Sequence, residues 1–162
     1  MMVNCRVSSN IVKGDILICY MTRVSRFFSL FEITDKYFID SKPIFANNED
    51  PYIIRFKVKP LVIFDIEHSI PIFDDLLWEK LSFTKKRSWT AMVRSSLREI
   101  QKEDGDLLKT VLLDQKTKNK VYKLSDADIR KLKQKQQKIK SSESIINVSV
   151  PEDDEELKKK RQ

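Results

Sequence analysis

The chain has 162 residues, 41% of them hydrophobic and 34% charged, which is enough for one ordinary domain and an appended segment. Its two cysteines, Cys5 and Cys19, form neither a disulfide framework nor a metal-binding spacing, so we expect reduced thiols in a cytoplasmic protein. Neither a membrane-spanning apolar run nor a signal-peptide pattern is present, so we expect neither membrane insertion nor secretion.

The positive charge is concentrated toward the C-terminus. Of the net charge of +7, residues 1–115 contribute +1 and residues 116–162 contribute +6. The aromatic side chains show the opposite distribution, and Tyr122 is the single one in the C-terminal part. We therefore expect a folded domain over residues 1–114, followed over residues 115–162 by a charged tail that is helical in part or disordered.

The first half of the chain favours β-strands. Short runs rich in β-branched and aromatic residues follow a Gly-Asp turn and lack helical periodicity; they cover residues 16–21, 27–33, 53–59 and 61–64. This pattern predicts a curled sheet or a small barrel. Within the second run we expect Phe28 and Leu30 to face the core and Phe27 to lie nearer an opening.

Residues 37–48, between the second and third runs, predict a loop. Pro43 cannot donate a hydrogen bond to a strand ladder, and Asn47-Asn48 favours a turn. The third run then alternates between apolar residues and the cations Arg55, Lys57 and Lys59. These cations have two interpretations, a solvated strand face and a track for phosphates.

The second half of the chain favours helices. Apolar spacing predicts helices over residues 72–81, 90–101 and 104–113, the second of them with Ser88 as its N-cap. In the tail, residues 125–140 permit a further helix. Together with the preceding strands, these helices predict an α+β fold in which helices flank the sheet.

The chain offers little for catalysis. Its single histidine, His68, cannot supply the convergent ligands of a metal site, although Asp65 and Glu67 lie nearby in the sequence. Glycine occurs only twice, which excludes a glycine-rich phosphate loop. The acidic pairs Asp65/Glu67 and Asp74-Asp75 leave a small metal-dependent nuclease as an alternative, but we expect no enzyme activity, cofactor or metal.

Several segments of the first half carry a family resemblance. They read GDILICYMT over residues 14–22, FFSLFEI over 27–33, YFIDSKPIF over 37–45 and PYIIRFKV over 51–58. As a set they resemble the EVE domain, a PUA-like fold related to the YTH domain. The resemblance continues through Ser88-Trp89 and into the predicted helix, so it covers about residues 11–113. Relative to EVE domains the chain is short at its N-terminus, where those domains have a further strand.

This resemblance implies a module that reads a modified base in DNA or RNA, with methylated adenine or cytosine derivatives as leading candidates. It implies an aromatic base pocket formed by Phe45, Tyr20, Thr22, Tyr37 and Phe27. The cations expected at phosphates are Arg23, Arg26, Lys85, Lys86, Arg87 and Arg94. Trp89 and Arg55 match family positions with two roles each: Trp89 either holds its helix to the sheet or stacks, and Arg55 either joins the site or forms an internal salt bridge.

Other partners stay open at this point. A protein-interaction accessory that acts through the basic tail is an alternative to the base-reading module. The missing N-terminal strand would leave a sheet edge exposed, which favours a homodimer or a strand from a partner chain. The choice between DNA and RNA is also left open by the sequence.

Overall fold

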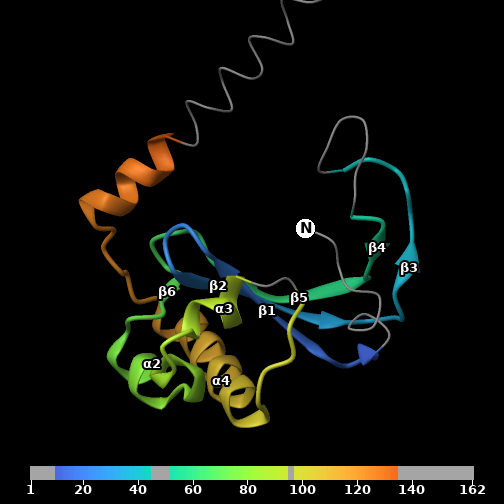
Figure 1. Ribbon diagram of the computed structural model, residues 1–162, viewed down its shortest axis with the longest axis horizontal. Helices are drawn as coiled ribbons and strands as arrows, with labels where there is room; N and C mark the ends of the chain where they lie inside the picture. Colours follow the sequence, from blue (N-terminus) through green and yellow to red (C-terminus); the bar gives the residue numbers. More distant parts are fainter. Residues whose placement is uncertain (1–9, 45–51, 95–96, 135–162) are drawn as a thin grey trace, which may run out of the picture. The chain divides into compact units, whose positions relative to one another are not determined.

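The computed structural model describes residues 10–44, 52–94 and 97–134, and it confirms an α+β fold with antiparallel sheets (Figure 1). Two compact units are present, one ending at Lys123 and one beginning at Leu124. The candidate site lies in the first unit. No helix in the described ranges is long and apolar enough to cross a membrane.

The main sheet contains β1 (Ile16–Met21), β2 (Arg26–Ile33) and β5 (Val58–Ile63), with the short β6 (Ile70–Pro71) also paired to β2. The order is β1-β2-β5, and each neighbouring pair is antiparallel. Because β1 and β5 do not pair with each other, the sheet is open, and the expectation of a closed small barrel does not hold for the described strands.

A second, two-stranded sheet is formed by β3 (Phe38–Ile39) and β4 (Ile54–Arg55). It lies at the opposite end of the main sheet from β6 and the helix α2 (Asp75–Lys80), as Figure 1 shows. The segment predicted as a loop therefore begins with two residues of strand. Arg55 secures the pair, because its guanidinium contacts Asp40 Oδ2 at 2.6 Å and also donates to the carbonyl oxygens of Tyr52 and Lys42.

A β-bulge changes which side chains of β2 face the core. Cys19 of β1 pairs with Ser29 of β2, but the next residue of β1 pairs with Phe27, so Phe28 is the extra residue. The bulge interrupts strict alternation and brings both Phe27 and Leu30 into the core, while Phe28 stays partly exposed. The expectation that Phe28 faces the core and Phe27 an opening was therefore wrong.

Four helical segments follow the strands in the first unit: α2 (Asp75–Lys80), η1 (Ser82–Lys85), α3 (Trp89–Arg94) and α4 (Lys102–Lys118). The carboxylate of Asp74 caps α2 by accepting from the backbone N–H of Leu76 at 3.2 Å. Asn119 ends α4 in the left-handed conformation with φ 49°, which is a common helix termination. The helix expected from residue 90 thus ends at Arg94, and the helix expected over 104–113 is longer at both ends.

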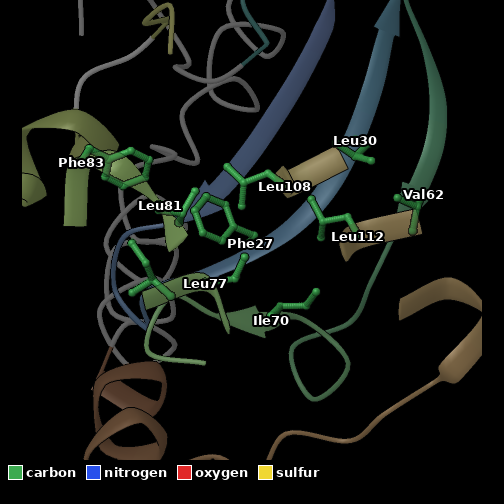
Figure 2. Packing of buried hydrophobic residues seen from close by; sticks show 10 residues of the cluster. Phe27, Leu30, Val62, Ile70, Leu77, Leu81, Phe83, Leu108 and Leu112 are labelled. Carbon is green, nitrogen blue, oxygen red and sulfur yellow. The ribbon is translucent and has the colours of Figure 1, made fainter. Parts of the chain in front are cut away.

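The core lies where α4 and the segment from α2 to η1 pack against β2, β5 and β6. Figure 2 shows this packing, with Phe27 and Leu30 of β2 near Leu108 and Leu112 of α4 and near the residues between β6 and η1. Burial of each such leucine or phenylalanine contributes about 1.5–3 kcal/mol relative to exposure. This core fixes the sheet against the helices and so positions the turn and helix that form the candidate site.

Polar contacts extend the first unit beyond residue 114, where composition alone placed the boundary. Gln115 is buried, and its amide donates to the carbonyl oxygens of His68 at 2.8 Å and Lys120 at 2.6 Å. Arg26, exposed by only 3%, donates to the carbonyl oxygens of Tyr122 at 3.0 Å and Lys123 at 2.9 Å. These bonds integrate a polar segment that a count of apolar residues assigns to the tail.

The second unit begins with a helix over residues 126–134. Ser125 caps it, because its hydroxyl oxygen accepts from the backbone N–H of Asp128 at 3.1 Å while its hydroxyl donates to the Asp128 carboxylate at 2.7 Å. The expectation of a helix starting near Ser125 therefore holds for residues 126–134. The remainder of the expected helix, residues 135–140, lies outside the described residues.

Candidate functional site

A small hollow lies between the turn after β1 and helix α3. Its volume is about 30 Å³, and its lining comprises Tyr20, Thr22, Ser25, Trp89, Thr90, Val93 and Arg94. Four of these residues, Tyr20, Thr22, Trp89 and Arg94, were named from the sequence. The fold thus brings together two segments that lie almost seventy positions apart in the chain.

Tyr20 forms one wall of the hollow. Its ring packs edge-on against the buried ring of Phe27, with centroids 4.9 Å apart and an interplanar angle of 61°. Burial raises the pKa of the Tyr20 phenol, against smaller opposing effects of a hydrogen bond with Ser25 and the charge of Arg94. Tyr20 therefore keeps its proton near neutral pH and can both donate and accept hydrogen bonds in the hollow.

The turn between β1 and β2 places hydroxyl groups beside Tyr20. Ser25 has a φ of 55°, in the left-handed region that residues other than glycine seldom adopt. Its carbonyl oxygen accepts from the backbone N–H of Ile72 at 2.9 Å, which holds the turn against the segment after β6. Across the hollow, Thr90 on α3 supplies a further hydroxyl. The lining of the hollow is therefore rich in hydroxyl groups, which can both donate and accept hydrogen bonds.

Trp89 forms the opposite wall and also belongs to an aromatic patch, which we define as Phe73, Trp78 and Trp89. The ring of Trp89 meets Trp78 at 5.5 Å and Phe73 at 5.8 Å, both edge-on, and the Phe73 and Trp78 rings are 5.1 Å apart. These contacts attach α3 to α2 and to the segment before it, whereas the structural role expected for Trp89 was to hold its helix to the sheet. Trp89 is also among the residues that line the hollow, and its stacking role stays a prediction.

Exposed cations lie at the hollow and in the segments next to it in the sequence. Arg94 lines the hollow, Arg23 lies in the turn after β1, Lys85 ends η1, and Lys86 and Arg87 connect η1 to α3. Within the described part of the chain, the cations from Lys85 to Arg94 form no ion pair. Lys57, by contrast, lies between β4 and β5, where its exposed ammonium group is 3.7 Å from the carboxylate of Asp35, as is typical of a solvated surface pair.

Two residues expected at the ligand are inside the fold instead. The guanidinium of Arg26 donates to four backbone carbonyl oxygens, those of Ile66 and Ser69 in addition to the two in residues 122–123. It is therefore a structural cation with no access to a phosphate, and the prediction for Arg26 was wrong. Phe27 is exposed by 3% and belongs to the core, so it supports Tyr20 from behind and does not line the hollow.

Other predicted site residues lie away from the hollow. Tyr37 is partly exposed and packs edge-on against Phe56 at 6.5 Å, near the two-stranded sheet. Arg55 forms the internal salt bridge with Asp40 that was its alternative role. Phe45, the first choice for an aromatic wall, lies outside the described residues.

Three residues of the hollow, Ser25, Thr90 and Val93, were not predicted. Thr90 and Val93 follow the named Trp89 at helical positions one and four, so a helix beginning at Trp89 would have indicated which face they share. Nothing in the local sequence signals the left-handed backbone of Ser25, because serine rarely adopts it.

The acidic residues considered for catalysis are not gathered into a site. Asp65 accepts from the backbone N–H of His68 at 2.9 Å and contacts its Nδ1 at 2.7 Å, a local turn contact that lowers the pKa of the Asp65 carboxyl. In the described ranges, no three His, Cys, Asp or Glu side chains are grouped as metal ligands.

Neither a protein-family model nor a curated protein matches the chain. The function is therefore inferred from the shape, lining and charge of the hollow and its surroundings.

Proposed function

We propose that this protein is a PUA-like module of the EVE type that binds nucleic acid and takes a single modified base into the hollow. The convergence of Tyr20, Trp89, three hydroxyl-bearing residues and Arg94 carries this proposal. A base has two faces for ring contacts, an edge that needs hydrogen-bond partners, and a phosphate on either side. The hollow offers a partner for each of these parts.

The chemistry of the lining suits an uncharged, polar ligand edge. Thr22, Ser25 and Thr90 can each donate or accept, and the neutral Tyr20 phenol does the same. Such groups adapt to the ring nitrogens and exocyclic groups of a base. Stacking against an aromatic ring contributes about 1–3 kcal/mol per base, which is enough to select an unpaired base over solvent.

The size of the hollow requires α3 to move when a base enters. A volume of about 30 Å³ has room for only a few water molecules, and a base needs a much larger space. Helix α3 has no fully buried residue and packs against the core through the partly buried Trp89, Met92 and Val93, so it buries less apolar surface than the core strands do. We infer that the hollow opens by displacement of α3, with Tyr20 and the turn fixed against the core.

The exposed cations then hold the sugar-phosphate backbone. Arg94 lies at the hollow itself, while Lys85, Lys86 and Arg87 precede α3 and Arg23 lies in the opposite turn. Contacts of this kind set the register of the strand and make binding sensitive to salt, but they read no sequence. The residues that line the hollow must then distinguish one base from another.

The alternatives named from the sequence gain no observation of their own. A nuclease would use Asp65 or Asp75, but Asp65 is bonded to His68 and no grouped metal ligands occur in the described ranges. An accessory acting through the tail would use residues of which 135–162 lie outside the described ranges.

The test removes single hydroxyl groups without changing side-chain shape. We expect Thr22→Val and Thr90→Val each to weaken binding of a methylated oligonucleotide by about two- to tenfold, because each loses one hydrogen bond. Their binding of the unmodified oligonucleotide should change less. Fluorescence anisotropy with matched methylated and unmodified DNA and RNA, at two salt concentrations, measures both affinities.

The matched control is Thr117→Val, on the exposed part of α4 and outside the hollow. It should bind both oligonucleotides as the native chain does. Equal affinity of the native chain for methylated and unmodified strands, erased by salt, would show that the cations alone bind nucleic acid and would overturn the base-reading proposal.

A further inference from the structure

The aromatic patch leaves large ring surfaces in contact with solvent. Phe73 is 57% exposed and Trp78 is 36% exposed, although both rings also contact Trp89. In an edge-to-face contact the edge of one ring meets one face of the other, so each contact covers only part of a ring, and Phe73 and Trp78 are held in place while much of their surface stays in solvent. Packing of α2 against α3 does not require two aromatic rings to be exposed side by side.

The patch continues directly from the hollow through Trp89. Trp89 is one of the residues that line the hollow, and its ring meets those of Phe73 and Trp78. The centroids of Trp89 and Phe73 are 5.8 Å apart. A ligand that enters the hollow therefore has its neighbouring unit within reach of the exposed rings.

The charge around the patch favours a polyanion. Lys80 ends α2, Lys85 ends η1, and Lys86 and Arg87 connect η1 to α3, all of them exposed. Asp75 and Glu79 on α2 are also exposed, whereas Asp74 lies 3.7 Å from the ammonium group of Lys120. From Lys80 to Trp89, the segment that joins the two tryptophan-bearing helices carries four cations and no acid.

We propose that the aromatic patch is a stacking platform for the nucleotide next to the base in the hollow, so that the ligand is single-stranded at that position. This inference rests on the proposed function and names its ligand class. Bases within a duplex already stack on their neighbours and expose no face. Unpaired bases can stack on aromatic side chains, and they do so whatever the nucleotide sequence around them. The cations between the helices then follow the backbone of the same strand.

The test uses a short, unmodified single strand of adenines, as DNA and as RNA, against the corresponding duplexes. We expect the native chain to bind the single strand at least about fivefold more tightly than the duplex, which corresponds to one stacked base. Phe73→Ala should erase this preference, and so should Phe73→Leu, which keeps an apolar side chain but has no ring. Because Phe73 is 57% exposed, both variants should remain folded, which their thermal unfolding verifies.

Ile63→Ala is the matched control, since Ile63 is also exposed, by 60%, but lies on β5 and contributes no ring. It should bind as the native chain does. A second measurement places an abasic site beside the base in the single strand: the loss of affinity should equal that of Phe73→Ala, and the two losses should not add. Additive losses would show that the missing base does not stack on Phe73 and would overturn the inference.

The outcomes separate this inference from the proposed function. If Phe73→Leu binds like the native chain, the patch makes apolar contacts without stacking, and the platform is overturned even when methylated strands are preferred. If single-strand preference depends on Phe73 but methylation and Thr22→Val have no effect, the platform stands and the base-reading proposal fails. Absence of binding to every strand by the folded native chain overturns both.

Discussion

Tyr122 is a single side chain whose ionisation is linked to the fold. Its phenol donates to the Asp74 carboxylate at 3.4 Å, and the ammonium group of Lys120 lies 4.5 Å from the centre of its ring. Burial raises the pKa of Tyr122 from its ordinary value of 10.0 to about 12, and the negative charge of Asp74 and the hydrogen bond to it act in the same direction. The folded state therefore favours the protonated phenol.

This shift predicts an alkaline loss of stability. The contribution of the protonated phenol is complete below pH 10 and is lost as the pH rises toward 12, because the unfolded chain releases its proton first. Tyr122→Phe should flatten the pH dependence of the free energy of unfolding in this window. Denaturant unfolding at several alkaline pH values measures it, and identical slopes for the two proteins would contradict the assignment.

At the level of single residues, the sequence was a better guide to side chains with suitable chemistry for a ligand site than to residues whose backbone conformation shapes the hollow. The aromatic and basic identities of Tyr20, Trp89 and Arg94 pointed to a ligand site through a family pattern, and the fold brings them together. Arg26 carries the same side chain as Arg94 yet is buried among carbonyl groups. Local sequence could not separate the two arginines, since the carbonyl partners of Arg26 are contributed by residues 40 to 97 positions away.

At the level of elements, the junction between η1 and α4 depends on one buried carboxylate. Asp104, in the first turn of α4, accepts from the backbone N–H of Ser82 at 2.8 Å and from its hydroxyl at 2.6 Å. A negative side chain also suits the N-terminal end of a helix. These bonds fix the start of η1 against α4 and so help to set where α3 begins.

We expect Asp104→Ala to lower the free energy of unfolding by about 2–3 kcal/mol, because two hydrogen bonds to a charged acceptor are lost and a backbone donor of Ser82 loses its partner. Asp106→Ala, an exposed position on the same helix, should stay within about 0.5 kcal/mol of the native chain. Urea denaturation measures both. A similar loss in the two variants would point to the helix end, and not to Ser82, as the cause.

The strands were predicted well where the apolar pattern of the sequence was regular. They were predicted poorly where pairing with a neighbouring strand changed which side chains face the core. Strand β1 matches its expected residues 16–21, since uninterrupted apolar sequence between two turns needs no long-range information. In β2 the bulge opposite Cys19 and Tyr20 shifts the inward-facing set, and only the partner strand determines that shift. Likewise, the open sheet depends on which strands pair, which the composition of each strand does not specify.

For the whole molecule, the end of the folded unit is a testable quantity. A chain ending at residue 114 lacks Gln115 and the two carbonyl groups in residues 122–123 that Arg26 binds. We expect it to lose about 3 kcal/mol or more of its free energy of unfolding, because a buried guanidinium is left with unmet hydrogen bonds.

A chain ending at Leu124 should unfold at nearly the same denaturant concentration as the full chain, since it keeps every contact of the first unit described above. Circular dichroism during guanidinium unfolding compares the three lengths. Equal stability of the two shortened chains would show that residues 115–123 add nothing to the fold. Composition placed this boundary too early because Gln115 and its neighbours are polar. Polar residues join a fold through hydrogen bonds to distant partners, and a count of apolar residues does not detect these bonds.

The position of Trp89 has a thermodynamic consequence for the whole molecule. Trp89 lines the hollow, and its indole ring contacts the exposed rings of Phe73 and Trp78, so a ligand that moves Trp89 at one place changes its contacts at the other. If a base binds in the hollow and its neighbour binds on the rings, as we propose, the two occupancies are coupled. By linkage the coupling is reciprocal, so the factor by which the neighbouring nucleotide changes affinity in the hollow is also the factor by which the base in the hollow changes affinity on the rings. A strand of two adjacent nucleotides would then bind cooperatively, with discrimination against mononucleotides arising from a side chain that reads no base edge.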